Sequence, residues 1–308
     1  MNQLLPEGKR HIMLNPRPLT EGNATEIKEF LKYSDKYMSL AKFPTLYLWH
    51  EYSELSYDIK DDFLFLFECN FDNSTFMPFG NGDIENAMYS LEEYCKKVSK
   101  QGLLYCMGEE DRKKVLEIFP NRYHVKEQDK FNEYVYLREN LAELTGKKYA
   151  KKRNHISKFM RQYGDVYEYC SISNSDRDEL KKVMDTWCIM RDCGPEDTSK
   201  FEQTAILKFL ANDAGLQYRG GAIRVNGKIE AFALGGKISD DMAVVYFEKA
   251  DTKFDGIYTM LNKQYVINEW PDVKYINRQE DMGMKGLRKS KMSYYPDFMV
   301  KNYSLKLK

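Results

Sequence analysis

The chain has 308 residues, of which 43% are hydrophobic, 31% charged and 14% aromatic, and its 47 Lys+Arg balance 47 Asp+Glu. This composition is that of a globular protein, and together with the length it excludes a peptide-sized, metal-stapled or fibrous protein. The length predicts about two domains, each large enough to bury its own core.

The neutral total hides two halves of opposite charge. Residues 1–136 carry 17 Lys+Arg against 23 Asp+Glu, whereas residues 137–308 carry 30 against 24. The positive excess lies in residues 143–161 and 285–308, each with seven basic residues and one acidic residue. Because phosphates bind through Lys and Arg, these two stretches are the predicted contacts for an anionic partner.

Signals for metal, disulfides and membranes are weak. The six cysteines form no CxxC pair, which predicts reduced core thiols in a cytoplasmic protein, with Cys188 and Cys193 packing at one helix end. The four histidines are neither spaced i, i+4 nor grouped with cysteines, so no metal is expected. Residues 1–18 lack the apolar stretch of a secretory signal, and no run reaches the ~18–20 residues of a membrane span.

The first half predicts alternating helices and strands. A helix is expected after Asn23 or Thr25, because Glu26 and Glu29 follow in its first turns. Residues 60–62 separate two β-rich runs and predict a hairpin. The expected elements are a hairpin of strands 55–59 and 63–69, a helix after the loop 80–83, a strand at 103–106, a helix at 109–118, and strands at 123–126 and 134–137.

The second half predicts a meander followed by helix, strand, helix and strand. Asn226 and Gly227 between alternating runs are the strongest hairpin signal in the chain. The expected helices are 147–163, 176–191, 201–210, 256–269 and 285–291, and the expected strands are 166–171, 218–225, 229–236, 242–249, 273–277 and 298–305. This order predicts an α+β fold whose sheet splays around a ligand.

Three segments resemble the lysylphosphatidylglycerol synthetase C-terminal-domain family. They are residues 147–159 (KKYAKKRNHISKF), 246–250 (YFEKA) and 275–296 (YINRQEDMGMKGLRKSKMSYYP), and a looser likeness includes residues 43–49 (FPTLYLW). The resemblance implies two tandem GNAT-like acyltransferase domains, each a mostly antiparallel mixed sheet flanked by helices, similar to Fem-type aminoacyltransferases. We expect them at residues 1–140 and 141–308, with the basic second domain active and the acidic first domain supporting it.

The same resemblance implies transfer of an acyl or aminoacyl group to an amine or hydroxyl acceptor, either a small molecule or a peptide. The carrier would be acyl-coenzyme A or aminoacyl-tRNA, and both remain open. A competing hypothesis is a non-catalytic module that binds RNA or an acidic partner through its basic face.

The first candidate site is the basic helix. Its cations would follow the phosphates of a tRNA acceptor stem, and the alternative is a solvated helix surface. The candidate RNA-binding residues are Lys147, Lys148, Lys151, Lys152 and Arg153.

The second candidate site follows the strand at 273–277. Glu280 or Asp281 would orient an amine nucleophile or take its proton, because carboxylates act as bases when burial raises their pKa. The alternative is a salt-bridge cluster that fixes the turn. The candidate donor-binding residues here are Arg278, Arg288, Lys289 and Lys291.

The third candidate site is the end of the strand at 242–249. Glu248 and Lys249 would lie beside the reacting carbonyl, and Gly256 would begin a helix that receives the donor phosphates. Asp251 and Asp255 oppose a pyrophosphate there and favour a donor held elsewhere, such as the 3′ end of tRNA. Tyr294 is a candidate proton donor to the leaving group, with a structural tyrosine as the alternative.

Overall fold

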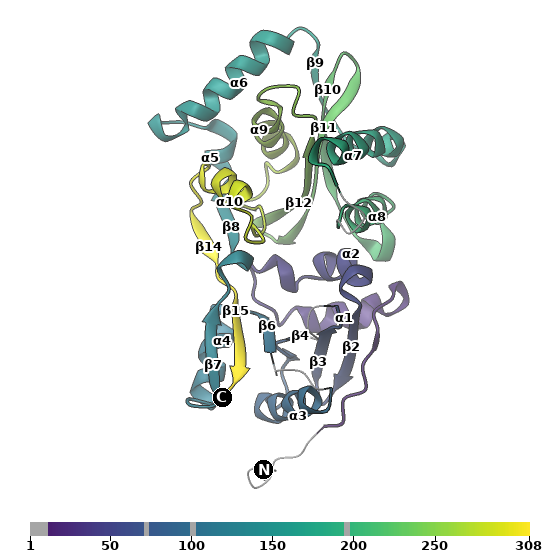
Figure 1. The fold of residues 1–308 in the computed structure, drawn as a ribbon, viewed down its shortest axis with the longest axis vertical. Helices are drawn as coiled ribbons and strands as arrows, with labels where there is room; N and C mark the ends of the chain where they lie inside the picture. Colours follow the sequence, from purple (N-terminus) through teal and green to yellow (C-terminus); the bar gives the residue numbers. More distant parts are fainter. Residues whose placement is uncertain (1–11, 71–73, 99–102, 194–197) are drawn as a thin grey trace. The chain divides into compact units, whose positions relative to one another are not determined.

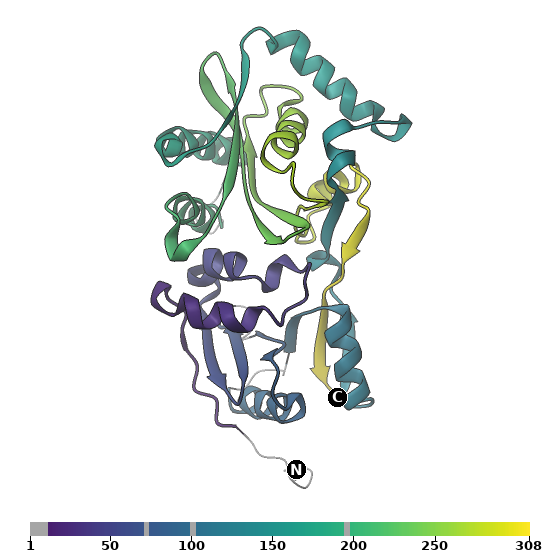
Figure 2. The same cartoon turned by 180° about the vertical axis from the view of Figure 1, so that it is seen from behind.

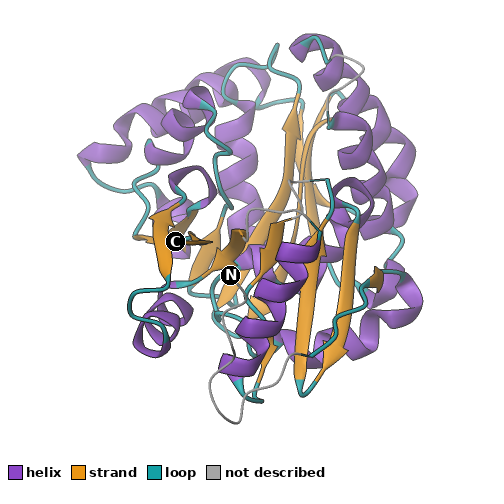
Figure 3. Cartoon of the chain, turned by 60° about the horizontal axis from the view of Figure 1, so that its bottom comes forward, coloured by secondary structure: helices purple, strands orange, loops and turns teal. Residues whose placement is uncertain are grey.

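The computed structural model describes residues 12–70, 74–98, 103–193 and 198–308, and it divides the chain into two compact units. The first unit is Met1–Phe131 with Lys301–Lys308, and the second is Asn132–Val300. Each unit has its own sheet, and the helices flank the strands (Figures 1 and 3). The expected division after residue 140 differs from this one, because strand β8 (Glu133–Leu137) belongs to the sheet of the second unit.

The first unit is built around a sheet with strand order β1-β2-β3-β4-β6-β15-β7, in which β5 pairs with β3. Its helices are α1 (Ala24–Leu31), α2 (Phe43–Ser53), α3 (Ile84–Lys97) and α4 (Glu109–Ile118). Its strands are β1 (Arg17–Pro18), β2 (Leu55–Lys60), β3 (Phe63–Glu68), β4 (Ser74–Phe76), β5 (Phe79–Gly80), β6 (Leu103–Met107), β7 (Tyr123–Glu127) and β15 (Tyr303–Leu307).

Local sequence signals explain several of these elements. The predicted hairpin of β2 and β3 is confirmed, with Lys60 opposite Phe63. Asp61 and Asp62 both have positive φ, at 45° and 62°, which is the backbone that a two-residue type I′ turn requires. Asp83 caps α3, because its carboxylate accepts hydrogen bonds from the next backbone N–H groups.

The predicted final strand at 298–305 is wrong in one respect. It is two strands in two sheets, β14 (Phe298–Val300) beside β8 and β15 between β6 and β7. The carbonyl of Asn302 between them accepts a hydrogen bond from the Gln128 N–H at 2.8 Å. The predicted strand is therefore interrupted at Lys301 and Asn302, and each part belongs to the sheet of a different unit.

The second unit has the strand order β14-β8-β13-β12-β11-β10-β9. Its helices are α5 (Arg138–Glu143), α6 (Ala150–Tyr163), α7 (Arg177–Arg191), α8 (Ser199–Leu210), α9 (Ile257–Glu269) and α10 (Lys285–Met292). Its strands beside β8 and β14 are β9 (Tyr167–Ser171), β10 (Arg219–Val225), β11 (Lys228–Ser239), β12 (Met242–Ala250) and β13 (Tyr275–Asn277). The predicted meander β10-β11-β12 is confirmed.

Helices cover both faces of this sheet. Helix α9 lies on one face, and α7 and α8 lie on the other (Figures 1 and 2). The core on the α9 side contains the buried rings of Tyr265 and Trp270. Because side chains alternate along a strand, neighbouring residues of β12 point into different layers.

Strand β12 is bulged and partly unpaired on one side. Its register passes from Leu234 opposite Phe247 to Gly235 opposite Val245, so Tyr246 is an extra residue. Its parallel pairing with β13 ends at Val244, and among the described strands residues 245–250 pair with β11 alone. Bulges of this kind occur next to active sites and re-aim side chains.

Candidate active site

A buried ion pair lies at the far end of β12. Oε2 of Glu248 accepts a hydrogen bond from Nη2 of Arg278 at 2.7 Å, and the two side chains are 14% and 11% exposed. Oε1 of Glu248 and Nη1 of Arg278 are also buried, and neither has a hydrogen-bond partner among the described residues. An unsatisfied buried polar atom costs about 1–3 kcal/mol, so this pair leaves one acceptor and one donor to be explained.

The surroundings keep Arg278 charged. Its guanidinium carbon is 5.0 Å from the centre of the Tyr294 ring and 6.0 Å from that of Tyr136. Burial lowers the pKa of Arg278, but Glu248 and these two tyrosines outweigh it, and the pKa lies above its usual value. The cluster therefore contains a fixed cation.

Lys152 also points into this cluster, although the sequence placed it on the exposed RNA-binding face. Its Nζ is 3.6 Å from the centre of the Tyr294 ring. Burial and, to a smaller extent, the neighbouring Arg278 lower the pKa of Lys152 to about 8, although Glu248 opposes them. About a tenth of this amine is therefore neutral at pH 7, so it can accept and return a proton.

A signal for the position of Lys152 is present in the sequence. Tyr149, Lys152, Ile156 and Phe159 recur at spacings of three and four residues, which puts them on one side of a helix. Tyr149 and Phe159 are fully buried. Lys152 lies on the same side of the helix as these buried rings, so its side chain also faces the interior.

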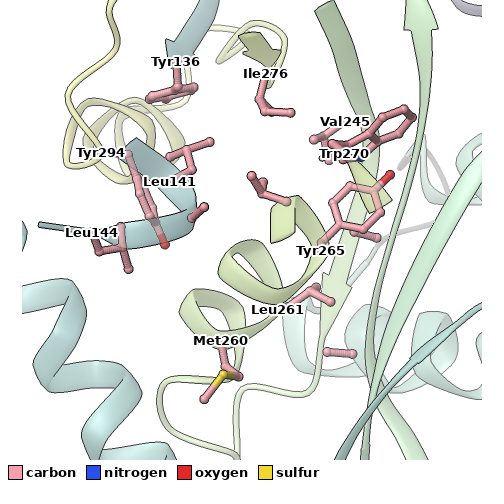
Figure 4. Close-up of a cluster of buried hydrophobic side chains, with 14 of the residues drawn as sticks. Tyr136, Leu141, Leu144, Val245, Met260, Leu261, Tyr265, Trp270, Ile276 and Tyr294 are labelled. Carbon is pink, nitrogen blue, oxygen red and sulfur yellow. The ribbon is translucent and has the colours of Figure 1, made fainter. Parts of the chain in front are cut away.

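The ring of Tyr294 packs against both Lys152 and Arg278. Its side chain is buried, and Figure 4 shows it among Tyr136, Leu141 and Leu144. Burial raises the pKa of Tyr294, while Arg278 and a hydrogen bond with Thr259 lower it. Thr259, on the first turns of α9, had no distinguishing signal in the sequence.

Asp281 and Arg288 hold the loop that follows β13. The Asp281 side chain is fully buried and accepts hydrogen bonds from Tyr134 Oη (2.5 Å), Arg288 Nε (2.7 Å) and the Gly283 N–H (2.7 Å). Burial raises the pKa of Asp281, but these bonds outweigh it and the pKa is lowered. The structure thus gives Asp281 and Arg288 the turn-fixing alternative, rather than the predicted contacts with substrate.

Lys291 anchors the same loop from inside. Its Nζ donates to the carbonyl oxygens of Arg278 (2.6 Å), Gln279 (3.2 Å) and Glu280. Burial lowers the pKa of Lys291 to about 8. Its predicted role in donor binding is replaced by positioning of Arg278, while the neighbouring Lys289 is exposed.

Glu280 remains a possible acid or base. Burial raises its pKa, and Lys291 opposes this effect. Its Oε2 is buried and has no hydrogen-bond partner within the part of the chain that the structure describes.

Lys249 lies on the other face of the sheet, away from Glu248. Its Nζ is 2.7 Å from Oε2 of Glu202 and 3.3 Å from the centre of the Trp187 ring. It borders a small, partly open pocket that is also lined by Met184 and Ser199. The predicted grouping of Lys249 with Glu248 is wrong because strand residues alternate between faces.

Gly256 has a packing role at the start of α9. Its φ is +89°, and a Cβ atom there would collide with the carbonyl oxygen of His155 in α6. The neighbouring Asp255 forms an ion pair with Lys158. Gly256 therefore allows α6 and the start of α9 to pack closely, and its role in phosphate binding stays a prediction.

The basic residues at 147–153 differ in their contacts. Arg153 donates to the carbonyl oxygens of Leu144 (2.6 Å) and Gly146 (2.7 Å) and thereby fixes the loop before α6. Lys147, Lys148 and Lys151 are exposed and form no ion pair with any described residue. Four of the five predicted RNA-binding residues are thus exposed, and of these four Arg153 is held by hydrogen bonds to the backbone.

Other predictions concern metal, membrane and cysteine chemistry. Within residues 12–70, 74–98, 103–193 and 198–308, no group of His, Cys, Asp or Glu could hold a metal ion, and no helix has the length and apolar character to cross a membrane. Cys188 and Cys193 form a disulfide, so the prediction of reduced thiols is wrong for these two. Cys69 is a free thiol as predicted, but it is exposed and does not lie in the core. The side chain of Cys106 lies outside those described.

The two α+β units, with mostly antiparallel sheets and a polar cluster at a bulged central strand, define a GNAT-like acyltransferase fold. The family model described as phosphatidylglycerol lysyltransferase, C-terminal, matches residues 31–306. The chain belongs to this family, and the expected resemblance is confirmed.

Solved structures share the fold at several levels of identity. A conserved protein of unknown function from Bacteroides thetaiotaomicron is 34% identical, with a TM-score of 0.85 over 96% of this chain and 100% of that one. L-PGS from Bacillus licheniformis is 15% identical, with a TM-score of 0.64 over 96% and 94%. FemX is 8% identical, with a TM-score of 0.57 over 94% and 97%. These last two show the fold alone.

An uncharacterized protein of Mycoplasmoides gallisepticum is also a relative. It is 28% identical over 178 residues. This match spans 56% of the chain and 56% of the relative, so it covers little more than half of either protein.

Proposed function

We propose that the chain transfers an aminoacyl group from a charged tRNA to an amine or hydroxyl acceptor. Its family carries the name of a lysyltransferase, which supports aminoacyl transfer as the reaction class. The second unit would contain the active site, and the first unit would support it. A charged tRNA as donor implies that the protein works in the cytoplasm.

One observation carries the proposal, namely the unsatisfied donor and acceptor of the buried Glu248–Arg278 pair. An aminoacyl ester offers matching groups, a carbonyl oxygen and an ammonium. Nη1 of Arg278 would donate to the carbonyl oxygen, where negative charge develops as the nucleophile attacks. Oε1 of Glu248 would accept from the ammonium of the aminoacyl group.

Lys152 would act as the general base and then as the general acid of the transfer. In its neutral form it takes a proton from the attacking amine or hydroxyl as the new bond to the acyl carbon forms. When the bond from that carbon to the ribose oxygen breaks, the Lys152 ammonium returns a proton to the leaving oxygen. The pKa of about 8 favours both steps near neutral pH.

The choice of tRNA over coenzyme A rests on the start of α9. A coenzyme A pyrophosphate would use the N–H groups of a helix N-terminus after the central strand. Here Gly256 is packed against His155, and Asp255 adds a negative charge. The exposed Lys147, Lys148 and Lys151 instead offer cations on the outer surface of the unit.

The test is a transfer assay with tRNA charged with labelled amino acids and an extract of small molecules and peptides as acceptors. Acetyl-coenzyme A serves as the competing donor. We expect Arg278→Lys to lower the transfer rate by about 10²–10³-fold, because one oxyanion donor is misplaced. Arg219→Lys is the matched control, because Arg219 also pairs with a carboxylate, Asp272, and lies 4.9 Å from a Trp270 ring.

Two results would contradict the proposal. Full activity of Arg278→Lys would remove the proposed oxyanion contact. RNA binding without transfer from any donor would instead favour the non-catalytic module.

A further inference from the structure

The exposed ring of Tyr295 lies beside both the basic stretch and the active-site cluster. Tyr295 is 46% exposed, whereas the preceding Tyr294 is 4% exposed and lies against Lys152 and Arg278. Tyr295 thus points outward, whereas Tyr294 points into the cluster.

The Tyr295 ring has two neighbours at the start of the basic helix. It packs edge-on against Tyr149, with ring centres 5.6 Å apart, and Nζ of Lys148 is 5.5 Å from its centre. The hydroxyl of Tyr149 also donates to the carbonyl oxygen of Tyr294 at 3.0 Å. The start of the basic helix and the tyrosine pair therefore hold each other in place.

The backbone at Tyr295 is unusual for a large residue. Its φ is +55°, in the left-handed region that bulky side chains avoid. Such strain costs about 1–3 kcal/mol and is retained where the surroundings enforce it, which is common at binding sites.

We propose that Tyr295 is a stacking platform for an unpaired base at the 3′ end of an RNA, with Lys147, Lys148 and Lys151 contacting the adjacent phosphates. Proteins bind single strands by combining aromatic rings for the bases with cations for the backbone. This arrangement would hold the end of the strand next to Tyr294, where the ester of an aminoacyl carrier would meet Arg278. The inference rests on the proposed function and specifies how its carrier is held.

The test is binding of a labelled RNA hairpin with a short unpaired 3′ end, compared with the same hairpin with a blunt end, by fluorescence anisotropy. We expect Tyr295→Ala to weaken binding of the first RNA by about 5- to 100-fold and to leave the second unaffected. Tyr295→Phe keeps the ring and should bind normally, whereas Tyr295→Leu keeps apolar bulk without a π face and should bind weakly. Thermal melting checks that each variant is folded.

Matched controls come from the rest of the chain. Tyr33 is 41% exposed, and Nζ of Lys32 is 5.3 Å from its ring centre, so Tyr33→Ala removes a similar exposed pair. Lys148→Glu should reduce the salt dependence of binding, and Lys182→Glu, on exposed α7 surface, should not.

The outcomes separate this inference from the proposed function. Equal binding of both RNAs by wild type and Tyr295→Ala, or no RNA binding at all, overturns the platform even if transfer is observed. Binding that depends on Tyr295 and on the unpaired end, without any transfer, supports the platform and defeats the proposed reaction. If the stacking platform and the proposed transfer reaction are both correct, Tyr295→Ala should raise KM for the charged tRNA with little change in kcat.

Discussion

The pH dependence of transfer should report the protonation of Lys152. With a pKa of about 8, about 9% of this amine is neutral at pH 7, against about 0.03% for a lysine at the usual 10.5. The lowered pKa thus enlarges the reactive form about 300-fold. We expect the rate to rise with pH and to level off above pH 8.

The decisive substitution is Lys152→Arg. It keeps the positive charge, but a guanidinium stays protonated at every pH of the assay and cannot act as a base. We expect the rate to fall by about 10²–10⁴-fold and the rise toward pH 8 to disappear. Glu248→Gln should move the rise to lower pH, because the Glu248 carboxylate raises the pKa of Lys152.

Single-turnover transfer from charged tRNA between pH 6 and 9, corrected for spontaneous ester hydrolysis, measures these effects. Lys182→Arg is the control for a lysine-to-arginine change on an exposed helix surface. The reasoning is refuted if Lys152→Arg transfers at the wild-type rate with the same rise near pH 8.

Two further predictions concern stability, measured by urea unfolding. Asp281→Asn should cost about 1–3 kcal/mol, since the fully buried Asp281 carboxylate accepts hydrogen bonds from Tyr134, Gly283 and Arg288, whereas Asp272→Asn, at a 41%-exposed carboxylate, should cost under about 1 kcal/mol; equal costs would contradict the anchoring role of Asp281. Burial raises the pKa of Glu68 to about 7, so the folded state binds this proton more tightly than the unfolded state, and stability should fall as pH rises from 4.5 through 7. Glu68→Gln should remove that slope and, allowing for solvent screening, stabilise by about 1–2 kcal/mol at pH 8; an unchanged slope would show that Glu68 titrates normally.

Much of the fold follows from local patterns. The hairpin of β2 and β3, helix α4 and the meander β10-β11-β12 depend on turn residues and periodicity that are visible in the sequence. The place of β15 does not, because pairing with β6 and β7 is decided by long-range register. The polar Lys301 and Asn302 interrupt residues 298–305, but the sequence alone does not show that the two parts pair in different sheets.

The sequence brings together only part of the candidate site, because several of its contacts also join residues that are far apart in the chain. Glu248, Arg278 and Tyr294 meet because the ends of β12 and β13 lie together. Lys152 was grouped with its basic neighbours because charge counts ignore the helical position of a side chain. The sequence suggests a reactive acid at Asp281 because its hydrogen-bond partner Tyr134 is 147 residues away and cannot be identified from local patterns.

Strand β15 has a consequence for the order of folding. The hydrogen bond between Gln128 and Ser304 joins residues 176 positions apart, so the first unit depends on contacts that span the whole second unit. Strand β14 ends only three residues before β15 begins, so the same final stretch of the chain completes both sheets. Strand β15 must then pair with β6 and β7, which lie far earlier in the sequence, and we therefore expect slow closure of the first unit because distant contacts form late.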